Sequence, residues 1–301
     1  MVRSITRLTL CAAVLLAGIA EAQVLRKIEV TKLKADDVRQ LELHARRGES
    51  RAMTLLGIAT AEGYGVAADP KTAVKWLSRA AKVDDIAQEY LATMLRAGKG
   101  VPTDLATARM LFAKAAAQGN RRAQFNYASM CFNGDGGQQD VDAAAKYFEI
   151  AARQGDAEAQ HMIGRMYQYG RGVVQDYEQA TKWYEKAAEQ NYVPSMFALG
   201  LAYSDGDLGA RDTAKATKYL ERSAARGDWA SANKLAHMYL EEGAAAANNA
   251  EAYKWLAIAH ELSGMESVPS PAALEGQMKP VELSAAQQQV TEWKTLHLNA
   301  K

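Results

Sequence analysis

The stretch that decides the fold of this chain is Ala159–Ala188, AQHMIGRMYQYGRGVVQDYEQATKWYEKAA, because its pattern occurs in six copies along the sequence. Each copy contains an Asp or Asn that is followed four residues later by alanine. These head residues are Asp69, Asp104, Asp140, Asp176, Asp212 and Asn248, separated by 35 residues once and by 36 residues thereafter. A fixed period of this length indicates a repeat architecture, in which each copy is one unit of supersecondary structure.

The residues that follow each head residue predict an α-helix, which we call the second helix of the repeat. An Asp or Asn side chain at this point caps the free amides of the first turn. In the quoted copy Ala180, Trp183, Tyr184 and the pair Ala187-Ala188 come next, at a spacing that places them on one helix face. The eighth position after the head is always large and apolar: Leu77, Phe112, Phe148, Tyr184, Leu220 and Leu256. We call this set the large column.

Another helix, the first helix of the repeat, precedes each head residue. It begins with a leading small residue, and the six are Ala52, Ala87, Ala123, Ala159, Ser195 and Ser231. Five residues later stands a second small residue: Gly57, Ala92, Ala128, Gly164, Gly200 or Ala236. We call this set the small column, and we expect it to let the two helices of a repeat approach closely.

A glycine turn joins the two helices, as in Gly170-Arg171-Gly172 of the quoted copy. Glycine suits the positive φ that ends one helix and redirects the chain. The fifth and sixth copies depart from the pattern, at residues 206–209 and 242–244, so we expect longer or looser turns there.

The composition agrees with a helical chain and excludes some functions. Alanine, the best helix former, accounts for 59 of the 301 residues. Charged residues at 24% and hydrophobic residues at 49% are typical of a globular protein and argue against wholesale disorder. Lys and Arg number 36 against 35 Asp and Glu. This balance argues against a nucleic-acid-binding protein, which carries a basic face.

Together these columns resemble the Sel-one-like repeat (SLR) family, a relative of the tetratricopeptide repeats. The matching pattern is A-x-x-x-L-G-x-x-Y-x-x-G-x-G-V-x-x-D-x-x-x-A-x-x-W-Y-x-x-A-A, and the copy at 159–188 carries every element of it. The resemblance covers residues 50 to 260 approximately. It implies an all-α fold, a right-handed α-solenoid (superhelix) of about six helix pairs with capping helices. It also implies, by analogy, a scaffold for protein interactions.

The first segment, residues 1–22, reads as a secretory signal peptide. Arg3 and Arg7 precede an apolar run at 8–20, and Ala20-Glu21-Ala22 forms an A-x-A cleavage site. An uncleaved anchor is the weaker alternative, because this run is short for a membrane span. We therefore expect cleavage after Ala22, no stable membrane insertion afterwards, and a periplasmic or secreted protein. The mature chain would hold 34 basic and 34 acidic residues.

The remaining segments are expected to cap the repeats. Residues 23–49 form an N-terminal segment with a capping helix at 36–47, and residues 50–264 form the six repeats. Residues 265–301 form a linker and a C-terminal capping helix. We expect that last helix to begin at a capping box of Ser284 and Gln287.

Sequence motifs for catalysis or metal binding are sparse. The five histidines show no H-x-x-x-H or H-E-x-x-H spacing, so we predict no metal site and no cofactor. Cys131, the only thiol of the mature chain, falls in a core column, which predicts a buried, inert thiol. Ser231-Ala232-Asn233-Lys234 spells S-x-x-K, the nucleophile motif of penicillin-recognising enzymes. Ser231, however, is a leading small residue of the core, and no S-D-N or K-T-G accompanies it.

The family resemblance implies that the first helices line a concave face. We take the inward-facing positions to be −1, +2, +6 and +9, counted from the leading small residue. They hold Arg51, Thr54, Ile58, Ile86, Glu89, Thr93, Arg96, Arg122, Phe125, Ser129, Phe132, Glu158, His161, Arg165, Gln168, Pro194, Phe197, Leu201, Ser204, Asn233 and His237. Arginine and aromatic side chains dominate interface energetics. The central set, Arg122, Phe125, Phe132, His161, Arg165 and Phe197, is therefore our candidate partner-binding groove.

The alternative for Phe125, Phe132 and Phe197 is that they pack between adjacent repeats. For the whole protein we favour a non-enzymatic interaction scaffold or adaptor of the cell envelope or secreted space. It would bind a protein or peptide partner, with regulation of a signalling or envelope pathway and host interaction as two open roles. The alternative functions are a β-lactam- or cell-wall-directed hydrolase and a self-assembling structural array.

Overall fold

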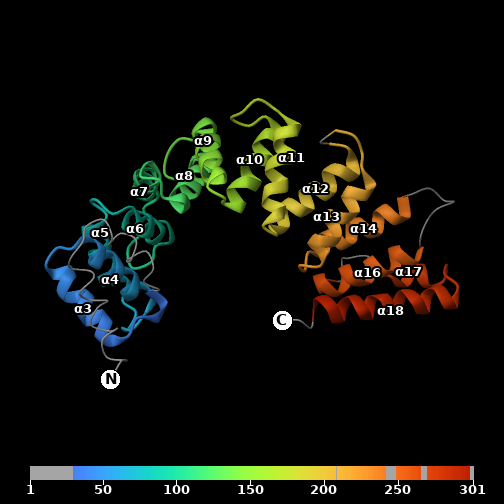
Figure 1. The fold of residues 1–301 in the computed structure, drawn as a ribbon, viewed down its shortest axis with the longest axis horizontal. Helices are drawn as coiled ribbons and strands as arrows, with labels where there is room; N and C mark the ends of the chain where they lie inside the picture. The colour runs from blue at the N-terminus through green and yellow to red at the C-terminus, as the bar shows by residue number, and fades with distance from the viewer. Residues whose placement is uncertain (1–29, 208, 242–248, 266–269, 299–301) are drawn as a thin grey trace, which may run out of the picture. The chain divides into compact units, whose positions relative to one another are not determined.

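The computed structural model describes residues 30–207, 209–241, 249–265 and 270–298, and every regular element within them is helical. A short 3-10 helix, η1 (Val30–Lys32), comes first. The α-helices are α3 (Ala35–Arg46), α4 (Ser50–Glu62), α5 (Pro70–Ala80), α6 (Asp85–Ala97), α7 (Leu105–Ala117), α8 (Arg121–Asn133), α9 (Val141–Arg153), α10 (Ala157–Tyr169), α11 (Tyr177–Glu189), α12 (Val193–Asp205), α13 (Thr213–Ala224), α14 (Trp229–Glu241), α16 (Asn249–Ser263), α17 (Ala272–Glu275) and α18 (Pro280–His297). Consecutive helices pair within each repeat (Figure 1), which confirms the predicted all-α repeat fold.

The chain divides into two compact units, one up to Ala151 and the other from Ala152. The first unit has a core built from α3 to α8, with Leu77 and Phe112 fully buried. The second unit has a core built from α11 to α18, with Leu199 and Leu220 fully buried. The predicted signal peptide lies outside the described residues.

The second helices begin as the sequence predicts. Asp104 Oδ1 accepts a hydrogen bond from the Thr107 amide at 2.9 Å, and Asp176 Oδ1 accepts one from the Gln179 amide at the same distance. Asp69, Asp140 and Asp212 cap their helices in the same way, whereas Asn248 lies outside the described residues. An aspartate carboxylate therefore fixes where each of these helices starts.

The first helices have caps that the columns above did not include. Asp84, Asn120 and Asp156, each three residues before a leading small residue, accept hydrogen bonds from the amides of Ala87, Ala123 and Ala159. The corresponding residues Glu49 and Tyr192 make no such bond. Capping residues thus mark the starts of both helices of a repeat. They are less regular at the first helix than at the second.

In the three repeats whose small column holds glycine, that glycine lies directly against the large-column residue. A Cβ added to Gly57 would lie 2.6 Å from Leu77 Cγ, and one added to Gly164 would lie 2.9 Å from Tyr184 Cδ1. All six residues of the large column are buried. The glycine and alanine of the small column therefore make room for one large side chain in each repeat, as predicted.

Glycine turns hold successive repeats together. The first glycine of each described turn ends a first helix in the left-handed region, with φ of 80° at Gly134. In the third turn the second glycine packs against the preceding repeat, since a Cβ on Gly136 would lie only 2.2 Å from the Leu105 carbonyl oxygen, whereas in the fifth turn a Cβ on Gly209 would meet nothing within 4 Å. Residues 242–248, which include the sixth turn, lie outside the described residues.

Capping helices lie at both ends of the repeats. Helix α3 packs against α4 and buries Ala45, the residue that corresponds to Ala80 of the first repeat. At the other end α18 packs against α16, with the Trp255 and Trp293 rings 6.4 Å apart. The terminal helices therefore cover the outer faces of the first and last repeats.

The predicted start of α18 was wrong. The helix begins at Pro280, four residues before Ser284, and Ser284 lies exposed inside it. Proline fits the first helical position because its missing amide hydrogen would have no helical partner there. Glu282 Oε2 accepts a hydrogen bond from the Lys279 amide at 3.3 Å, so this pair replaces the capping box expected at Ser284 and Gln287.

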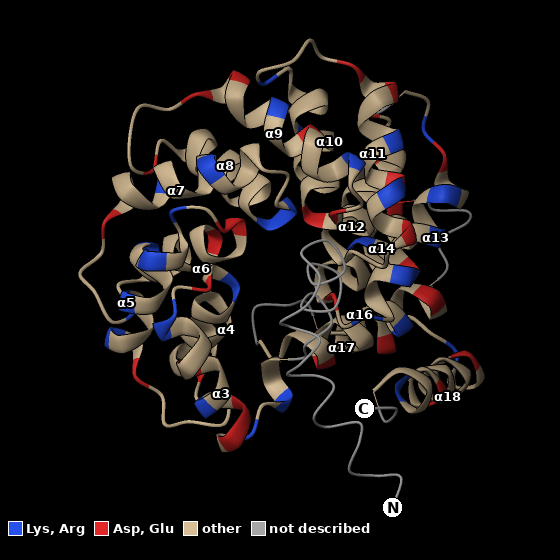
Figure 2. Cartoon of the chain, turned by 60° about the vertical axis from the view of Figure 1, so that its left-hand side comes forward, with Lys and Arg blue, Asp and Glu red and all other residues tan. Residues whose placement is uncertain are grey.

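Basic and acidic side chains are interspersed along the helices of both units (Figure 2). Many form pairs one helical turn apart, such as Lys182 with Glu178 at 2.5 Å. Exposed pairs of this kind contribute little to stability, typically under about 1 kcal/mol. Packing between the small column and the large column, rather than ion pairs on the surface, therefore stabilises the repeats.

We predict that Gly200→Val destabilises the protein by about 2 kcal/mol or more, because a Cβ at this position would lie 2.5 Å from the buried Leu220 Cγ. Ala214→Val adds the same branched side chain on an exposed position of α13 and should cost less than about 1 kcal/mol. Urea unfolding followed by circular dichroism measures both changes. Equal losses in the two variants would contradict the role of the small column.

Candidate functional site: the first-helix surface and the α10–α12 pocket

The positions predicted to face inward on the first helices divide into two groups by burial. At position +2, Thr54 and Glu89 are only 0% and 4% exposed. Glu89 Oε1 lies 3.6 Å from Nε of Arg122 in the next repeat, and burial raises the pKa of the Glu89 carboxyl. Glu89 therefore joins neighbouring repeats, whereas Arg122 at −1 and Arg165 at +6 are exposed. We call the exposed faces of α4, α6, α8, α10, α12 and α14 the first-helix surface.

Three of the six candidate groove residues, Arg122, Phe125 and Phe132, lie on α8 in the first unit. The Arg122 side chain is 70% exposed. Phe125 is half-buried, with its ring 5.5 Å from the ring of the buried Phe148, and Phe132 is also half-buried. On this helix the arginine offers a surface contact, while Phe125 packs against the second helix of its own repeat and not, as the alternative expected, between adjacent repeats.

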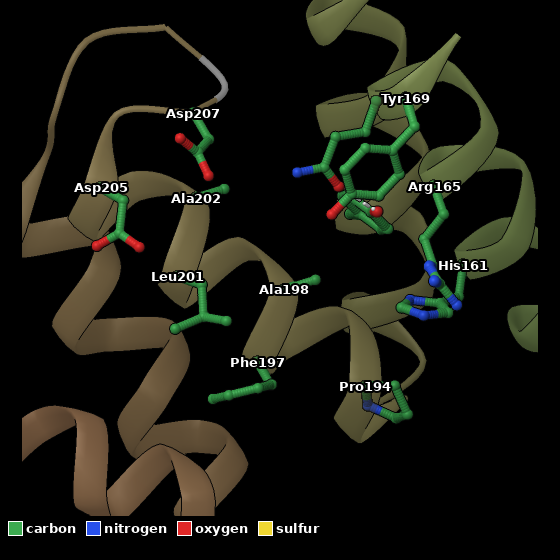
Figure 3. A pocket seen from close by; sticks show the side chains of 12 residues that line it. His161, Arg165, Tyr169, Pro194, Phe197, Ala198, Leu201, Ala202, Asp205 and Asp207 are labelled. Atoms are coloured by element: carbon green, nitrogen blue, oxygen red, sulfur yellow. Dashed lines mark hydrogen bonds between the residues drawn. The ribbon is translucent and has the colours of Figure 1, made fainter. Parts of the chain in front are cut away.

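The other three, His161, Arg165 and Phe197, line one pocket of the second unit, between α10 and α12 (Figure 3). The pocket has a volume of about 290 Å³ and is partly open to solvent. Its lining residues are His161, Arg165, Gln168 and Tyr169 of α10, Tyr184 of α11, Pro194, Phe197, Ala198, Leu201, Ala202 and Asp205 of α12, and Asp207 after α12. The helical spacing of the first helices thus brings predicted residues of adjacent repeats together here.

His161 connects the two helices that form the pocket. Its Nδ1 and the Oγ of the buried Ser195 share a hydrogen bond of 2.9 Å, and its ring centroid lies 5.4 Å from that of Tyr184. Burial, followed by the charge of Arg165, lowers the pKa of His161 to about 4. The imidazole is therefore neutral at pH 7 and positions α12 against α10.

Tyr184 of α11 holds the α10 wall of the pocket in place. Its side chain is buried, and its hydroxyl donates a hydrogen bond to Gln168 Oε1 at 2.7 Å. Gln168 is in turn held from the following turn, because Gln175 Nε2 donates to its carbonyl oxygen at 2.8 Å. The α10 side of the pocket is therefore pre-formed.

Charges of opposite sign lie on the two sides of the pocket. Arg165 is exposed and forms no hydrogen bond or ion pair within the described residues. On the other side Asp205 Oδ1 pairs with Lys234 Nζ at 2.9 Å, and this bond lowers the pKa of the Asp205 carboxyl. Figure 3 shows Asp205 and Asp207 across the pocket from Arg165 and His161.

The motif Ser231–Lys234 has structural contacts in this fold. Ser231 is fully buried, and its hydroxyl donates to the Asp228 carboxylate at the start of α14. Lys234 makes the ion pair with Asp205. Both residues of the suggested nucleophile motif are thus occupied in positioning helices.

Cys131 is buried, as predicted, and Arg109 Nη2 lies 3.4 Å from its sulfur. Over the described residues there is no group of three or more His, Cys, Asp or Glu that could hold a metal ion. In the same part of the chain no helix has the length and apolar character needed to cross a membrane.

The sequence predicted the side of the pocket formed by α10 better than the parts formed by Tyr184 and by the acidic residues Asp205 and Asp207. Gln168, Pro194 and Leu201 were among the positions expected to face inward, and all three line the pocket. Tyr184 belongs to the large column and was expected only in the core. Asp205 and Asp207 stand at the end of α12, outside the four inward positions, and the missed signal was a pair of acids flanking a helix-ending glycine.

Comparison with protein families gives six matches to the Sel1 repeat, at residues 50–85, 85–120, 121–156, 157–192, 193–228 and 229–262. No match to the chain was found among curated proteins.

Among solved structures, the chain is similar to a protective antigen of uropathogenic Escherichia coli strains that displays an SLR fold. The two are 28% identical with a TM-score of 0.71, over 88% of this chain and 56% of that one. The chain thus spans little more than half the length of that relative. A Sel1 repeat protein from Oxalobacter formigenes is 29% identical with a TM-score of 0.63, over 90% of this chain and 87% of that one. The C-terminal part of a TPR repeat-containing protein from Cytophaga hutchinsonii, 14% identical with a TM-score of 0.51 over 81% of this chain and 95% of that one, shares the fold.

We predict that His161 makes the stability of the protein pH-dependent. Its pKa of about 4 in the folded protein lies below the usual 6.5, so its contribution is complete above pH 6.5 and is lost as the pH falls toward 4. At pH 5 the loss is about 2 kcal/mol. His161→Asn keeps a polar atom near Ser195 but does not titrate. Urea unfolding at pH 7.5 and 5 should therefore show a smaller drop for this variant than for the wild type, and equal drops would contradict burial of the imidazole.

Proposed function

Because the chain belongs to the Sel1 repeat family, we propose that it is a non-enzymatic scaffold that binds a protein or peptide partner on its first-helix surface. The observation that carries the proposal is the α10–α12 pocket, where His161, Arg165 and Phe197 meet. It combines an exposed guanidinium, aromatic rings and a pre-formed wall, which are features of protein-binding sites. The scaffold role of Sel1 repeats in general supports the same assignment.

The chemistry of the pocket supports binding over catalysis. His161 is neutral at pH 7 but is hydrogen-bonded to the buried Ser195, which leaves no open path from that hydroxyl to a substrate. Ser231 and Lys234 are engaged with Asp228 and Asp205. A hydrolase would need a nucleophile and a base converging on accessible space.

Export from the cytoplasm is part of the proposal. It rests on the basic start, apolar run and A-x-A site of residues 1–22. One similar protein is described as a protective antigen, and proteins outside the cytoplasm are the ones that antibodies reach in intact bacteria. We propose that the mature protein acts in the periplasm or is secreted.

The export proposal predicts that the mature protein begins at Gln23. Edman sequencing or mass spectrometry of the protein from periplasmic and culture fractions measures this end. Ala22→Arg should block cleavage, because the signal peptidase site requires small residues. A cytoplasmic protein that retains Met1 or Val2 would refute export.

The scaffold proposal predicts where a partner lies. A photo-crosslinking amino acid replaces Arg122 or Arg165 on first helices, or the exposed Lys146 or Lys182 on second helices as matched controls. Irradiation of the producing bacteria should give adducts with another protein from the first-helix positions and few from the controls. Mass spectrometry identifies the partner.

Adducts from Lys146 and Lys182 alone would overturn the first-helix assignment. A second result would overturn the non-enzymatic assignment: hydrolysis of a β-lactam by the purified protein that disappears in Ser231→Ala. The helical circular dichroism spectrum of each variant must match the wild type, so that loss of binding is separated from loss of folding.

A further inference from the structure

Arg165 is the charged residue among the pocket residues of α10. Its guanidinium is exposed at the rim and has no hydrogen-bond or ion-pair partner within the described residues. The neighbouring His161 is neutral at pH 7, since its pKa is about 4. A ligand that enters the pocket therefore meets one fixed positive charge on this side.

The opposite side is acidic. Asp205 is neutralised in part by Lys234, which lies 2.9 Å from Oδ1. Asp207, the last lining residue, is exposed, and its carboxylate has no hydrogen-bond or ion-pair partner among the described residues. The unpaired positive and negative charges of the pocket thus lie on opposite sides, as Figure 3 shows.

Apolar side chains lie between the two charged sides. Phe197, Ala198 and Leu201 are each half-buried, and Phe197 and Ala198 stand between the charged sides in Figure 3. The volume of about 290 Å³ falls at the lower limit of the 300–1,000 Å³, roughly, that pockets for small molecules have. One or two side chains of a longer chain fit such a space, and the pocket is partly open to solvent, so the rest of the chain can lie outside it.

We infer that this pocket holds a peptide segment of the partner in which an apolar side chain is flanked by an acidic residue on the Arg165 side and a basic residue on the Asp207 side. The inference rests on the proposed scaffold function and specifies the chemistry of its partner. Complementary charges at the rim fix the direction in which the segment lies, more than they add affinity. Tyr169, 60% exposed beside Arg165, adds a hydroxyl that can donate a hydrogen bond to the acidic end of the segment.

The test begins with selection from a library of random peptides displayed on phage, against the full mature chain. Enriched peptides should carry an acidic and a basic residue on opposite sides of an apolar residue, in one order. A selected peptide and its charge-reversed counterpart are then synthesised, and their Kd values are measured by fluorescence anisotropy.

The Kd values of charge variants of the pocket test the inferred charge pattern. Arg165→Glu should weaken the selected peptide about tenfold, and Arg165→Glu combined with Asp207→Lys should favour the charge-reversed peptide. Lys182→Glu makes the same kind of charge change on α11, outside this pocket, and should leave both Kd values unchanged. Leu201→Glu places a charge in the apolar part and should abolish binding of both peptides.

The outcomes separate the two levels of the proposal. Binding that is lost in Leu201→Glu but is indifferent to Arg165→Glu and Asp207→Lys overturns the charge pattern and leaves the scaffold function standing. Binding that survives Leu201→Glu, or the absence of any enriched peptide, overturns the pocket as a peptide site. Concentration-dependent dimerisation that Leu201→Glu abolishes would show that a second copy of the chain is the occupant, and it also overturns the inference.

Discussion

The structure depends on one kind of contact, between a small residue of the first helix and a large side chain of the second. Gly164 against Tyr184 and Gly200 against Leu220 show how little space is left, since a single added carbon would lie within 2.9 Å of its neighbour. Interiors packed at this density tolerate neither added nor removed volume. The contact fixes the separation of the two helices, and the glycine turn and the aspartate cap fix where each begins and ends. Alanine is abundant because close helix packing needs it at several positions in every copy.

This packing also determines which side chains are available for binding. Since each second helix covers one face of its first helix, and residues such as Glu89 and His161 contact the next repeat, only narrow strips of the first helices stay exposed. In the second unit such strips on α10 and α12 border the pocket, and Tyr184 serves both as a core residue and as support for Gln168 through a 2.7 Å hydrogen bond. His161 is similarly shared, because its bond to Ser195 joins two repeats while its ring lines the pocket. The candidate site is therefore a by-product of the repeat geometry, made specific by the few residues that differ between copies.

Much of this could be predicted from the sequence, because the signals repeat. Six aligned copies revealed the helices, their caps at residues such as Asp176, and the close approach at Gly164. The prediction failed where the signal occurs once: α18 begins at Pro280, since Glu282 supplies the cap that had been expected from Ser284 and Gln287. The site was predicted in part. Helical spacing placed His161, Arg165 and Phe197 on adjacent exposed faces, but spacing does not tell how deeply a side chain is covered. Glu89 and Phe125 were expected on the same surface and are instead buried and half-buried by neighbouring side chains. Asp207 follows the helix-ending Gly206, where helical periodicity no longer applies.

The central claim is that the exposed strips of the first helices, and the pocket between α10 and α12 in particular, form the binding surface of this scaffold. A crystal structure of the protein with its captured partner tests it most directly. The account predicts a partner chain seated between α10 and α12, with an apolar side chain against Leu201 and an acidic group within hydrogen-bond distance of Arg165. A partner bound only to the second helices, with the pocket uncovered, would contradict it.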